Sequence, residues 1–313
     1  MAIKLGIVGV GKIARAEHLP SLAASKDFEL VAAASRNANV DGVRNFKTLA
    51  EMLDAAPEIE AVSLCAPPTA RTADAHLALS RGLHVMLEKP PGATISEVHQ
   101  LIAHAQTARR TLFATWHSRY AAGVETARAW LATRTITSVS VSWREDIRVW
   151  HPGQDWILDA GGFGVFDPGI NALSILTHIL PSPFALRSAR LDVPSNRQSP
   201  IAADLHFALK GSGAPIHAGF DFLQTGPQTW DIVVETEAGR LELQRGGADC
   251  FIDGRAVEKD SEADTLHGEY AGLYRRFAAL IRANESDTDL APLVHVADAF
   301  LLGQRVVTAP FDF

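Results

Sequence analysis

The chain has 313 residues, of which 47% are hydrophobic and 21% charged, as in ordinary soluble globular proteins. This length allows two domains or one large one. The formal net charge of −7 and the absence of a basic cluster give no electrostatic reason to bind nucleic acid. No apolar run approaches the roughly 18 residues that a membrane span needs, so we expect no membrane partner either.

The two cysteines, Cys65 and Cys250, fall in expected strands far apart in the sequence. Neither a metal site nor a disulfide framework is therefore indicated. Free thiols fit a reducing compartment. The N-terminal apolar segment is interrupted by a glycine turn, unlike a signal peptide. Together these features predict a cytoplasmic protein.

The first third of the chain alternates strand and helix patterns at the rhythm of βαβ units. Strands are expected over Ile3–Val8, Phe28–Ser35, Ala61–Ala66, Leu83–Leu87 and Thr111–Thr115. Helices are expected from Ile13 and over Thr48–Asp54, Thr69–Arg81 and Ser96–Arg109. Right-handed crossovers would wind these elements into an open, doubly wound parallel sheet. Residues 1–118 are therefore predicted to form a Rossmann domain.

After His117 the rhythm changes. A helix over Val124–Thr133 and a strand over Ile136–Trp143 precede a glycine-rich loop and an apolar helix that ends at Leu180. Strands follow from Leu186 to Val257, and helices over Gly268–Asn284 and Leu293–Val307 close the chain. We expect residues 119–313 to form a C-terminal α/β domain with a mostly antiparallel open sheet. This domain would bind the substrate, its exposed sheet face could pair two copies, and its last helix could pack back on the first domain.

The pattern Gly9-x-Gly11-x-x-Ala14 lies between a strand and a helix, as a dinucleotide-binding turn requires. Gly9 allows a tight turn, and Gly11 lets the backbone approach a pyrophosphate. The helix N-terminus around Lys12 and Ile13 offers unpaired N–H groups to the phosphates. The flanking strand and helix favour this interpretation over a plain glycine turn.

The second strand ends in Ser35-Arg36-Asn37, without the acid that usually binds the ribose 2′-hydroxyl of NAD. A hydroxyl and a guanidinium group would instead bind a 2′-phosphate. The sequence therefore predicts NADP as the preferred cofactor, with NAD tolerated. The alternative is that Arg36 is a solvated loop charge.

The fourth strand ends in Glu88-Lys89-Pro90-Pro91. A lysine at the carboxyl end of a central strand would face the nicotinamide side of the cofactor. The prolines fix the backbone that carries it, and a cis bond would fit there. Glu88 is also expected to contact the cofactor, as are Ala66 and Pro67 at the end of the third strand.

The chain resembles the glucose–fructose oxidoreductase / inositol dehydrogenase / rhizopine catabolism family over its whole length. The motifs that carry the likeness are Gly9-x-Gly11-x-x-Ala14, Glu88-Lys89-Pro90 and Gly161-Gly162-x-x-x-x-Asp167-x-Gly169-x-Asn171. Further segments resemble the bacterial sugar 1-dehydrogenase branch that acts on L-arabinose and D-galactose. These segments are His18-Leu19-Pro20, Val62–Pro68, Ala114–Arg119 and Trp150–Gln154.

The resemblance implies oxidation of an aldopyranose at C1 to its lactone by an NAD(P)-dependent oxidoreductase that needs no metal. Its leading substrates, L-arabinose and D-galactose, match in configuration from C1 to C4. The alternatives are another sugar, an inositol or a trans-dihydrodiol as substrate, and a non-catalytic protein that senses NAD(P). Asn171 stands where the wider family has a histidine, and the sugar 1-dehydrogenase branch shares this asparagine.

A neutral polyol presents hydroxyls and apolar C–H faces, so its site should combine carboxylates, amides and flat aromatic rings. The residues that we expect to bind it are His117, Glu145, Trp150, Asp167, Asn171 and Trp230. We expect Asp167 to accept the proton of the anomeric hydroxyl and Lys89 to hold that hydroxyl, in the cleft between the domains. Asp167 could instead be an N-cap before Pro168, and Lys89 could be the proton acceptor.

Overall fold

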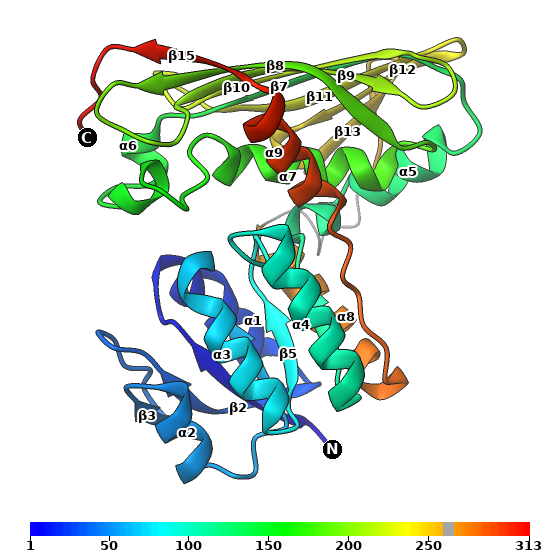
Figure 1. Cartoon of the computed structure of the whole chain (residues 1–313). Coiled ribbons are helices and arrows are strands. Elements are labelled where there is room, and N and C mark those ends of the chain that lie inside the picture. The colour runs from blue at the N-terminus through cyan, green and yellow to red at the C-terminus, as the bar shows by residue number, and fades with distance from the viewer. Residues whose placement is uncertain (259–265) are drawn as a thin grey trace. The chain divides into compact units, whose positions relative to one another are not determined.

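The computed structural model describes residues 1–258 and 266–313, which divide into two compact units (Figure 1). The first unit combines residues 1–117 with residues 266–290. The second contains residues 118–258 and 291–313 of the described chain. The C-terminal segment that belongs with the first unit therefore contains α8 (Leu266–Ala283), whereas the last helix, α9 (Ala291–Leu302), belongs to the second unit.

The sheet of the first unit has six parallel strands in the order β3-β2-β1-β4-β5-β6. Sheets with this strand order bind dinucleotides at the point where the order reverses, which here lies between β1 and β4. The strands are β1 (Ile3–Val8), β2 (Phe28–Ala34), β3 (Arg44–Phe46), β4 (Ala61–Leu64), β5 (His84–Leu87) and β6 (Leu112–Ala114). The expected doubly wound parallel sheet is confirmed.

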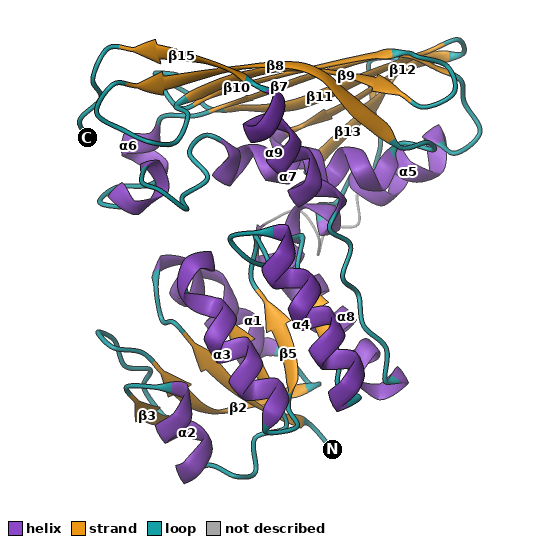
Figure 2. Cartoon of the chain, viewed as in Figure 1, coloured by secondary structure: helices purple, strands orange, loops and turns teal. Residues whose placement is uncertain are grey.

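The central strands of this sheet are buried on both faces, and Leu5, Val62 and Val85 have no exposed surface. Such strands occur where helices cover both sides of a sheet, as Figure 2 shows for this unit. Besides α8, the covering helices are α1 (Leu19–Ala24), α2 (Leu49–Ala55), α3 (Pro68–Ser80) and α4 (Ile95–Ala108). One π-helical turn, η1 (Ala14–His18), precedes α1.

The second unit contains a nine-stranded sheet in the order β14-β13-β12-β11-β7-β10-β9-β8-β15. Its pairs are antiparallel except β7–β10 and β8–β15. The strands are β7 (Ile136–Arg144), β8 (Phe184–Pro194), β9 (Ala202–Leu209), β10 (Pro215–Asp221), β11 (Thr229–Thr236), β12 (Gly239–Gln244), β13 (Asp249–Ile252), β14 (Arg255–Ala256) and β15 (Gln304–Thr308).

Helices cover one face of the second sheet, as Figures 1 and 2 show. They are α5 (Val124–Leu131), α6 (Ile147–Trp150), α7 (Phe166–Ile179) and α9. Along β7, the inward residues Val139, Val141 and Trp143 are buried and alternate with more exposed ones. This is the period of two expected for a sheet with one covered face. The predicted open, mostly antiparallel sheet is thus confirmed.

The predicted helix over Leu293–Val307 is wrong beyond Leu302. After Gly303 the chain forms β15, which pairs with β8. The β-branched residues Val306, Val307 and Thr308 suit a pleated strand better than a helix. Pairing with β8 therefore outweighs the helical spacing of the apolar residues.

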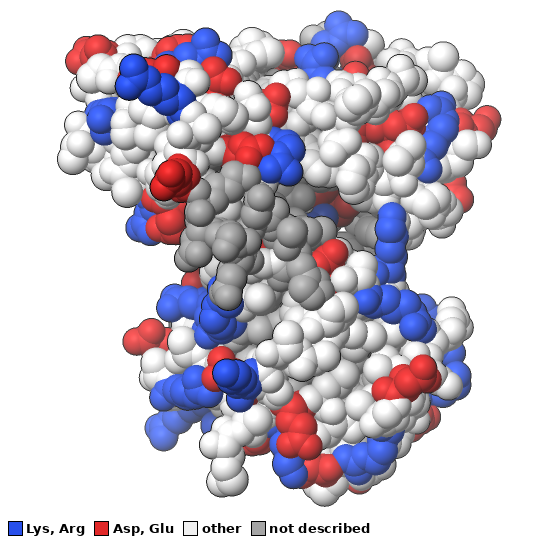
Figure 3. Space-filling model, turned by 180° about the vertical axis from the view of Figure 1, so that it is seen from behind, with Lys and Arg blue, Asp and Glu red and all other residues white. Residues whose placement is uncertain are grey.

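Among the described helices, none combines the length and the apolar character that crossing a membrane demands. On the face of the described residues shown in Figure 3, basic and acidic side chains lie interspersed.

Candidate functional site

The glycine turn after β1 has the shape that a dinucleotide requires. Gly9 has φ +87°, and a Cβ atom there would lie 2.6 Å from the main-chain nitrogen of Ala66. A side chain at this position would therefore collide with the end of β4. A Cβ atom at Gly11 would meet nothing within 4 Å. Open space lies where a pyrophosphate would approach the helix N-terminus formed by Lys12 and Ile13, so these residues fit the expected cofactor.

The loop after β2 gathers positive charge. The Ser35 hydroxyl accepts a hydrogen bond from the Val10 N–H at 3.4 Å, which ties this loop to the glycine turn. Arg15 donates to the Asn39 carbonyl at 3.1 Å, and Lys47 donates to the Arg36 carbonyl at 3.1 Å. The Arg36 side chain itself is exposed. Residues 35–40 contain no acid, and Asp41 is the one acid of the loop between β2 and β3.

A buried arginine holds the loops that follow β4 and β5. Arg71 lies on α3 and is 2% exposed. Its Nε and Nη2 donate to the Ala66 carbonyl at 3.0 and 2.5 Å. Its Nη1 donates to the carbonyls of Glu88 and Pro90. One guanidinium group therefore fixes the main chain at Ala66 and on either side of Lys89. The Lys89–Pro90 peptide bond is cis.

The Glu88 carboxylate is the centre of a buried polar cluster. It accepts a hydrogen bond from the Tyr270 hydroxyl at 2.5 Å and lies 3.4 Å from His18 Nε2. His18 Nδ1 lies 2.7 Å from the Tyr274 hydroxyl. Glu88, which precedes Lys89 in the sequence, is therefore held by side chains of η1 and of α8.

The charges in this cluster set the pKa values of its members. Burial alone would raise the pKa of Glu88, but the hydrogen bond and charge of His18, with His117 and Lys89, lower it to about 2. Burial alone would lower the pKa of His18, but Cys65, Tyr274 and Glu88 raise it well above its ordinary value. Glu88 and His18 thus form a buried ion pair.

His117, predicted as a sugar ligand, belongs to the first unit and begins η2 (His117–Tyr120). Its Nδ1 lies 2.7 Å from Glu269 Oε2, and its ring stacks on Tyr270 with centroids 5.4 Å apart. Burial raises the pKa of Glu269, and the contact with His117 opposes this rise. The sugar-binding role of His117 stays a prediction.

In the second unit, Glu145 follows β7 and is 2% exposed. It accepts a hydrogen bond from the Trp230 indole at 3.0 Å, and its other oxygen lies 2.9 Å from His151 Nε2. The Trp230 ring contacts Trp150, with centroids 4.7 Å apart, and stacks on Trp143 at 6.0 Å. The structure therefore brings together three predicted sugar ligands, Glu145, Trp150 and Trp230.

Asp167 is the second residue of α7, which begins at Phe166. The N-cap is Val165, without a side-chain hydrogen bond, so the alternative that Asp167 caps this helix is wrong. Asp167 is 7% exposed, and its Oδ2 lies 3.9 Å from His151 Nδ1. Asn171 lies one turn later on the same face of α7. His151 thus stands between two carboxylates, those of Glu145 and Asp167.

The sequence predicted no role for Arg71, His18, His151 or Tyr270. In the sequence, nothing distinguishes Arg71 from other arginines on helices. Tyr270 lies 182 positions from Glu88, so the sequence gives no sign of their contact. His18 and His151 fall inside segments that carried the resemblance, and these segments were the available signal.

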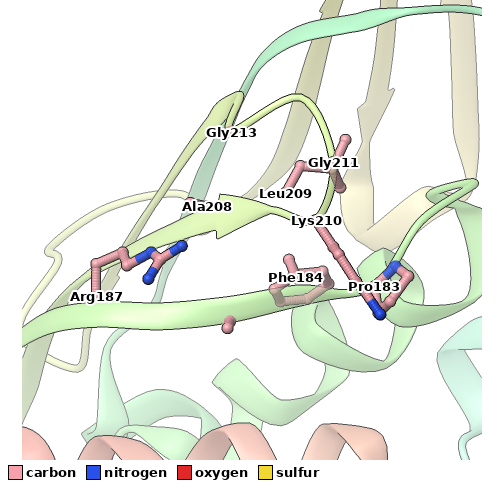
Figure 4. Close-up of a pocket in the computed structure, with 9 residues that line it drawn as sticks. Pro183, Phe184, Arg187, Ala208, Leu209, Lys210, Gly211 and Gly213 are labelled. Carbon is pink, nitrogen blue, oxygen red and sulfur yellow. The ribbon is translucent and has the colours of Figure 1, made fainter.

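A separate pocket lies between the start of β8 and the turn that joins β9 to β10 (Figure 4). The Lys210 side chain reaches toward Pro183 there, and Arg187 lies farther along β8. It contains none of the predicted site residues.

Taken together, the strand order, the glycine turn and the carboxylate–histidine cluster define the class of nicotinamide-dependent oxidoreductases. Residues 3–115 match the GFO_IDH_MocA family, described as an oxidoreductase family with an NAD-binding Rossmann fold, and the chain belongs to this family.

Two relatives match along the whole chain. The galactose 1-dehydrogenase of Pseudomonas fluorescens is 44% identical over 309 residues, which cover 99% of this chain and 98% of the relative. The crystal structure of a D-galactose-1-dehydrogenase protein from Rhizobium etli superposes with a TM-score of 0.93 at 57% identity, covering 99% of this chain and 98% of that one. A 3-ketoreductase from Actinomadura kijaniata, solved with NADP and TDP-benzene, shares the fold with a TM-score of 0.82 at 19% identity, covering 98% of this chain and 100% of that one.

Proposed function

We propose that the chain is an NADP-preferring aldose 1-dehydrogenase that oxidises D-galactose and L-arabinose at C1 to the corresponding lactones. The observation that carries this proposal is the arrangement of Glu145, His151 and Asp167 beside a Trp230 ring. The two full-length relatives named as galactose 1-dehydrogenases support it.

The substrate class follows from the chemistry of these side chains. The carboxylates of Glu145 and Asp167 accept hydrogen bonds from hydroxyls, and the Asn171 amide both donates and accepts. The Trp150 ring, 36% exposed, offers an apolar face to the C–H groups of a pyranose. L-arabinose and D-galactose share their configuration from C1 to C4, so a site that fits one accepts the other unless it clashes at C5.

The chain's own part in the reaction is to orient the sugar and to move one proton. The turn of Gly9, Gly11 and Lys12 would hold NADP, which would supply the acceptor for the hydride that leaves C1. Asp167 takes the proton of the anomeric hydroxyl, and His151, held by Glu145, lies beside the Asp167 carboxylate. Asn171 orients a hydroxyl but, being uncharged, takes no proton. Lys89 stabilises the negative charge that develops on the oxygen.

Preference for NADP is supported by the loop after β2. Arg15, Arg36 and Lys47 bring three positive charges to a loop whose one acid is Asp41, and residues 35–40 directly after β2 contain none. Charge-assisted hydrogen bonds from such groups favour a 2′-phosphate. We therefore expect NAD to be used less efficiently.

The proposal is tested by initial rates at the absorbance band of the reduced nicotinamide, with NADP and with NAD. The panel contains D-galactose, L-arabinose, D-glucose, an inositol and a trans-dihydrodiol. The largest kcat/KM is expected for D-galactose or L-arabinose with NADP. A largest value for the inositol or the dihydrodiol would contradict the substrate assignment. Tight NADP binding without turnover of any compound would favour a cofactor sensor instead.

A further inference from the structure

Three side chains that can bind a metal ion converge on the face of the second sheet opposite the buried inward residues. Asp204 and His206 belong to β9, and His217 belongs to the neighbouring antiparallel strand β10. Their side chains are between 47% and 56% exposed, so an ion in solution can reach them.

The strand register makes this convergence a property of the backbone. His217 lies directly opposite His206, and Asp204 lies two residues before His206 on the same strand. Since residues i and i+2 share one face of a strand, all three side chains project to the same side. β9 and β10 are interior strands of the sheet, so both are held by partners on each side.

The donor atoms already point at one another. Asp204 Oδ1 lies 2.8 Å from His206 Nε2, and Asp204 Oδ2 lies 2.7 Å from His217 Nε2. The two imidazole rings stack with centroids 4.8 Å apart and planes at 30°. All three ligand atoms lie within 4.8 Å of one another. A small swing of the carboxylate would let a cation bound at about 2.0–2.2 Å replace these contacts.

Small residues surround the cluster and leave room for water ligands. Gly219 lies opposite Asp204, Ser140 of β7 lies beside His217, and Ser188 of β8 lies opposite His206. A set of three protein ligands with an open fourth position is common in zinc sites that retain a water.

Positive charges near the three side chains limit their affinity for a metal cation. Arg190 of β8 lies opposite Asp204 in the register, and its Nε donates to Asp192 at 2.9 Å. The Arg144 guanidinium of β7 lies 3.5 Å from where a Cβ atom of Gly219 would stand. The negative charge of Asp204 is therefore needed to offset the two guanidinium groups.

We propose that Asp204, His206 and His217 form a binding site for one divalent transition-metal ion such as Zn²⁺. Imidazole nitrogens with one carboxylate suit zinc, nickel or copper rather than magnesium or calcium. The ion takes no part in the proposed oxidation. It links β9 to β10, and binding to the folded state alone raises the temperature of unfolding.

The test is calorimetric titration of the untagged, EDTA-treated protein with ZnCl₂. Wild type is expected to bind one ion per chain that His217→Gln and Asp204→Asn both fail to bind. The control variant His99→Gln removes an exposed histidine of α4 and should bind as wild type does. Zn²⁺ should also raise the Tm of wild type and of the control, but not that of the two site variants.

Two results would overturn the proposal. The first is an unchanged isotherm for His217→Gln, which would place the ion elsewhere, for example at His76 and His104, whose Nδ1 atoms lie 2.8 Å apart. The second is half an ion per chain for wild type, which would show a site shared between two copies. Circular dichroism of each variant confirms that the sheet is intact.

Discussion

At the residue scale, Arg71 shows how one buried cation can organise main chain that carries function. Its donors meet three carbonyl oxygens, those of Ala66, Glu88 and Pro90. Each buried carbonyl without a partner would cost about 1–3 kcal/mol. Arg71 is therefore expected to position both the cofactor loop and Lys89, without touching the substrate.

Two substitutions of Arg71 distinguish a role in positioning the cofactor loop and Lys89 from a role in stability alone. Arg71→Met leaves the three carbonyls unpartnered and should lower both the Tm and kcat. Arg71→Lys restores a charge but not the planar fork of donors, because lysine acts as a point charge. We expect it to recover most of the Tm while kcat stays at least about fivefold below wild type, since roughly 1 kcal/mol of orientation is lost. A wild-type kcat in Arg71→Lys would contradict the positioning role.

The proposed preference for NADP is tested at a second arginine, Arg36. Arg36→Ala removes a charge-assisted hydrogen bond to the 2′-phosphate and should raise KM for NADP about 10–100-fold, with little change for NAD. Lys26→Ala, which removes an exposed cation elsewhere on the first unit, serves as the control. Equal losses for both cofactors would show that Arg36 is not specific for the phosphate.

Asp167 is the proposed proton acceptor. Asp167→Asn keeps the size and polarity of the side chain at the second position of α7 while it deletes the base. A general base contributes about 10²–10⁴ in rate, so kcat should fall at least about 100-fold while NADP binding and Tm stay near wild type. If kcat stays within about threefold of wild type, the proton goes elsewhere, and His151 and Lys89 become the candidates.

At the element scale, η1 and α8 meet at Glu88, and this contact makes stability depend on pH. The lowered pKa of Glu88, about 2 against an ordinary 4.5, stabilises the fold above pH 4.5, and this contribution is lost as pH falls toward 2. The raised pKa of His18 contributes below pH 6.5, and that contribution is lost as pH rises through the raised value. Both contributions are present between about pH 4.5 and 6.5.

Glu88→Gln tests this pair by thermal unfolding between pH 3 and pH 6. Removing one partner of a buried ion pair costs about 3–5 kcal/mol, so the variant should melt well below wild type at pH 6. Because wild type loses the benefit of its carboxylate in acid, the gap in Tm should narrow from pH 4.5 downward. A gap that is constant over this range would mean that Glu88 is not ionised in the folded state.

The elements that the sequence predicted well are those with a strong local pattern. The apolar runs of β1, β4 and β5 and the capped helices α2 and α4 fall within one or two residues of their expected bounds, the usual margin for helix ends. Thr48 and Thr94 cap those two helices. The strands β3 and β15 escaped prediction because each is short and largely exposed, and β15 in addition depends on pairing with the distant strand β8.

The residues of the candidate site also fall into those that the sequence indicated and those that it did not. Gly9 and Glu145 could be singled out because each directly follows a strand, and Asp167 because it belongs to a motif that carried the resemblance. Tyr270 could not, because its contact with Glu88, 182 positions away, exists only in the folded chain. His151 lies in a segment that carried the resemblance, but its contacts with Glu145 and Asp167 were not predicted.

At the scale of the whole molecule, each unit supplies one half of the proposed chemistry. The first provides the dinucleotide-binding turn and Lys89, and the second provides Glu145, His151 and Asp167. In the proposed reaction, the hydride that reaches the cofactor therefore comes from C1 of an aldose.

Label transfer from D-galactose deuterated at C1 tests this claim directly. After turnover with NADP, mass spectrometry of the reduced cofactor should show one deuterium per molecule, and the sugar product should be the undeuterated lactone. Unlabelled galactose provides the control for background. Reduced cofactor without deuterium, formed at a comparable rate, would show that oxidation occurs at another carbon and would contradict the account.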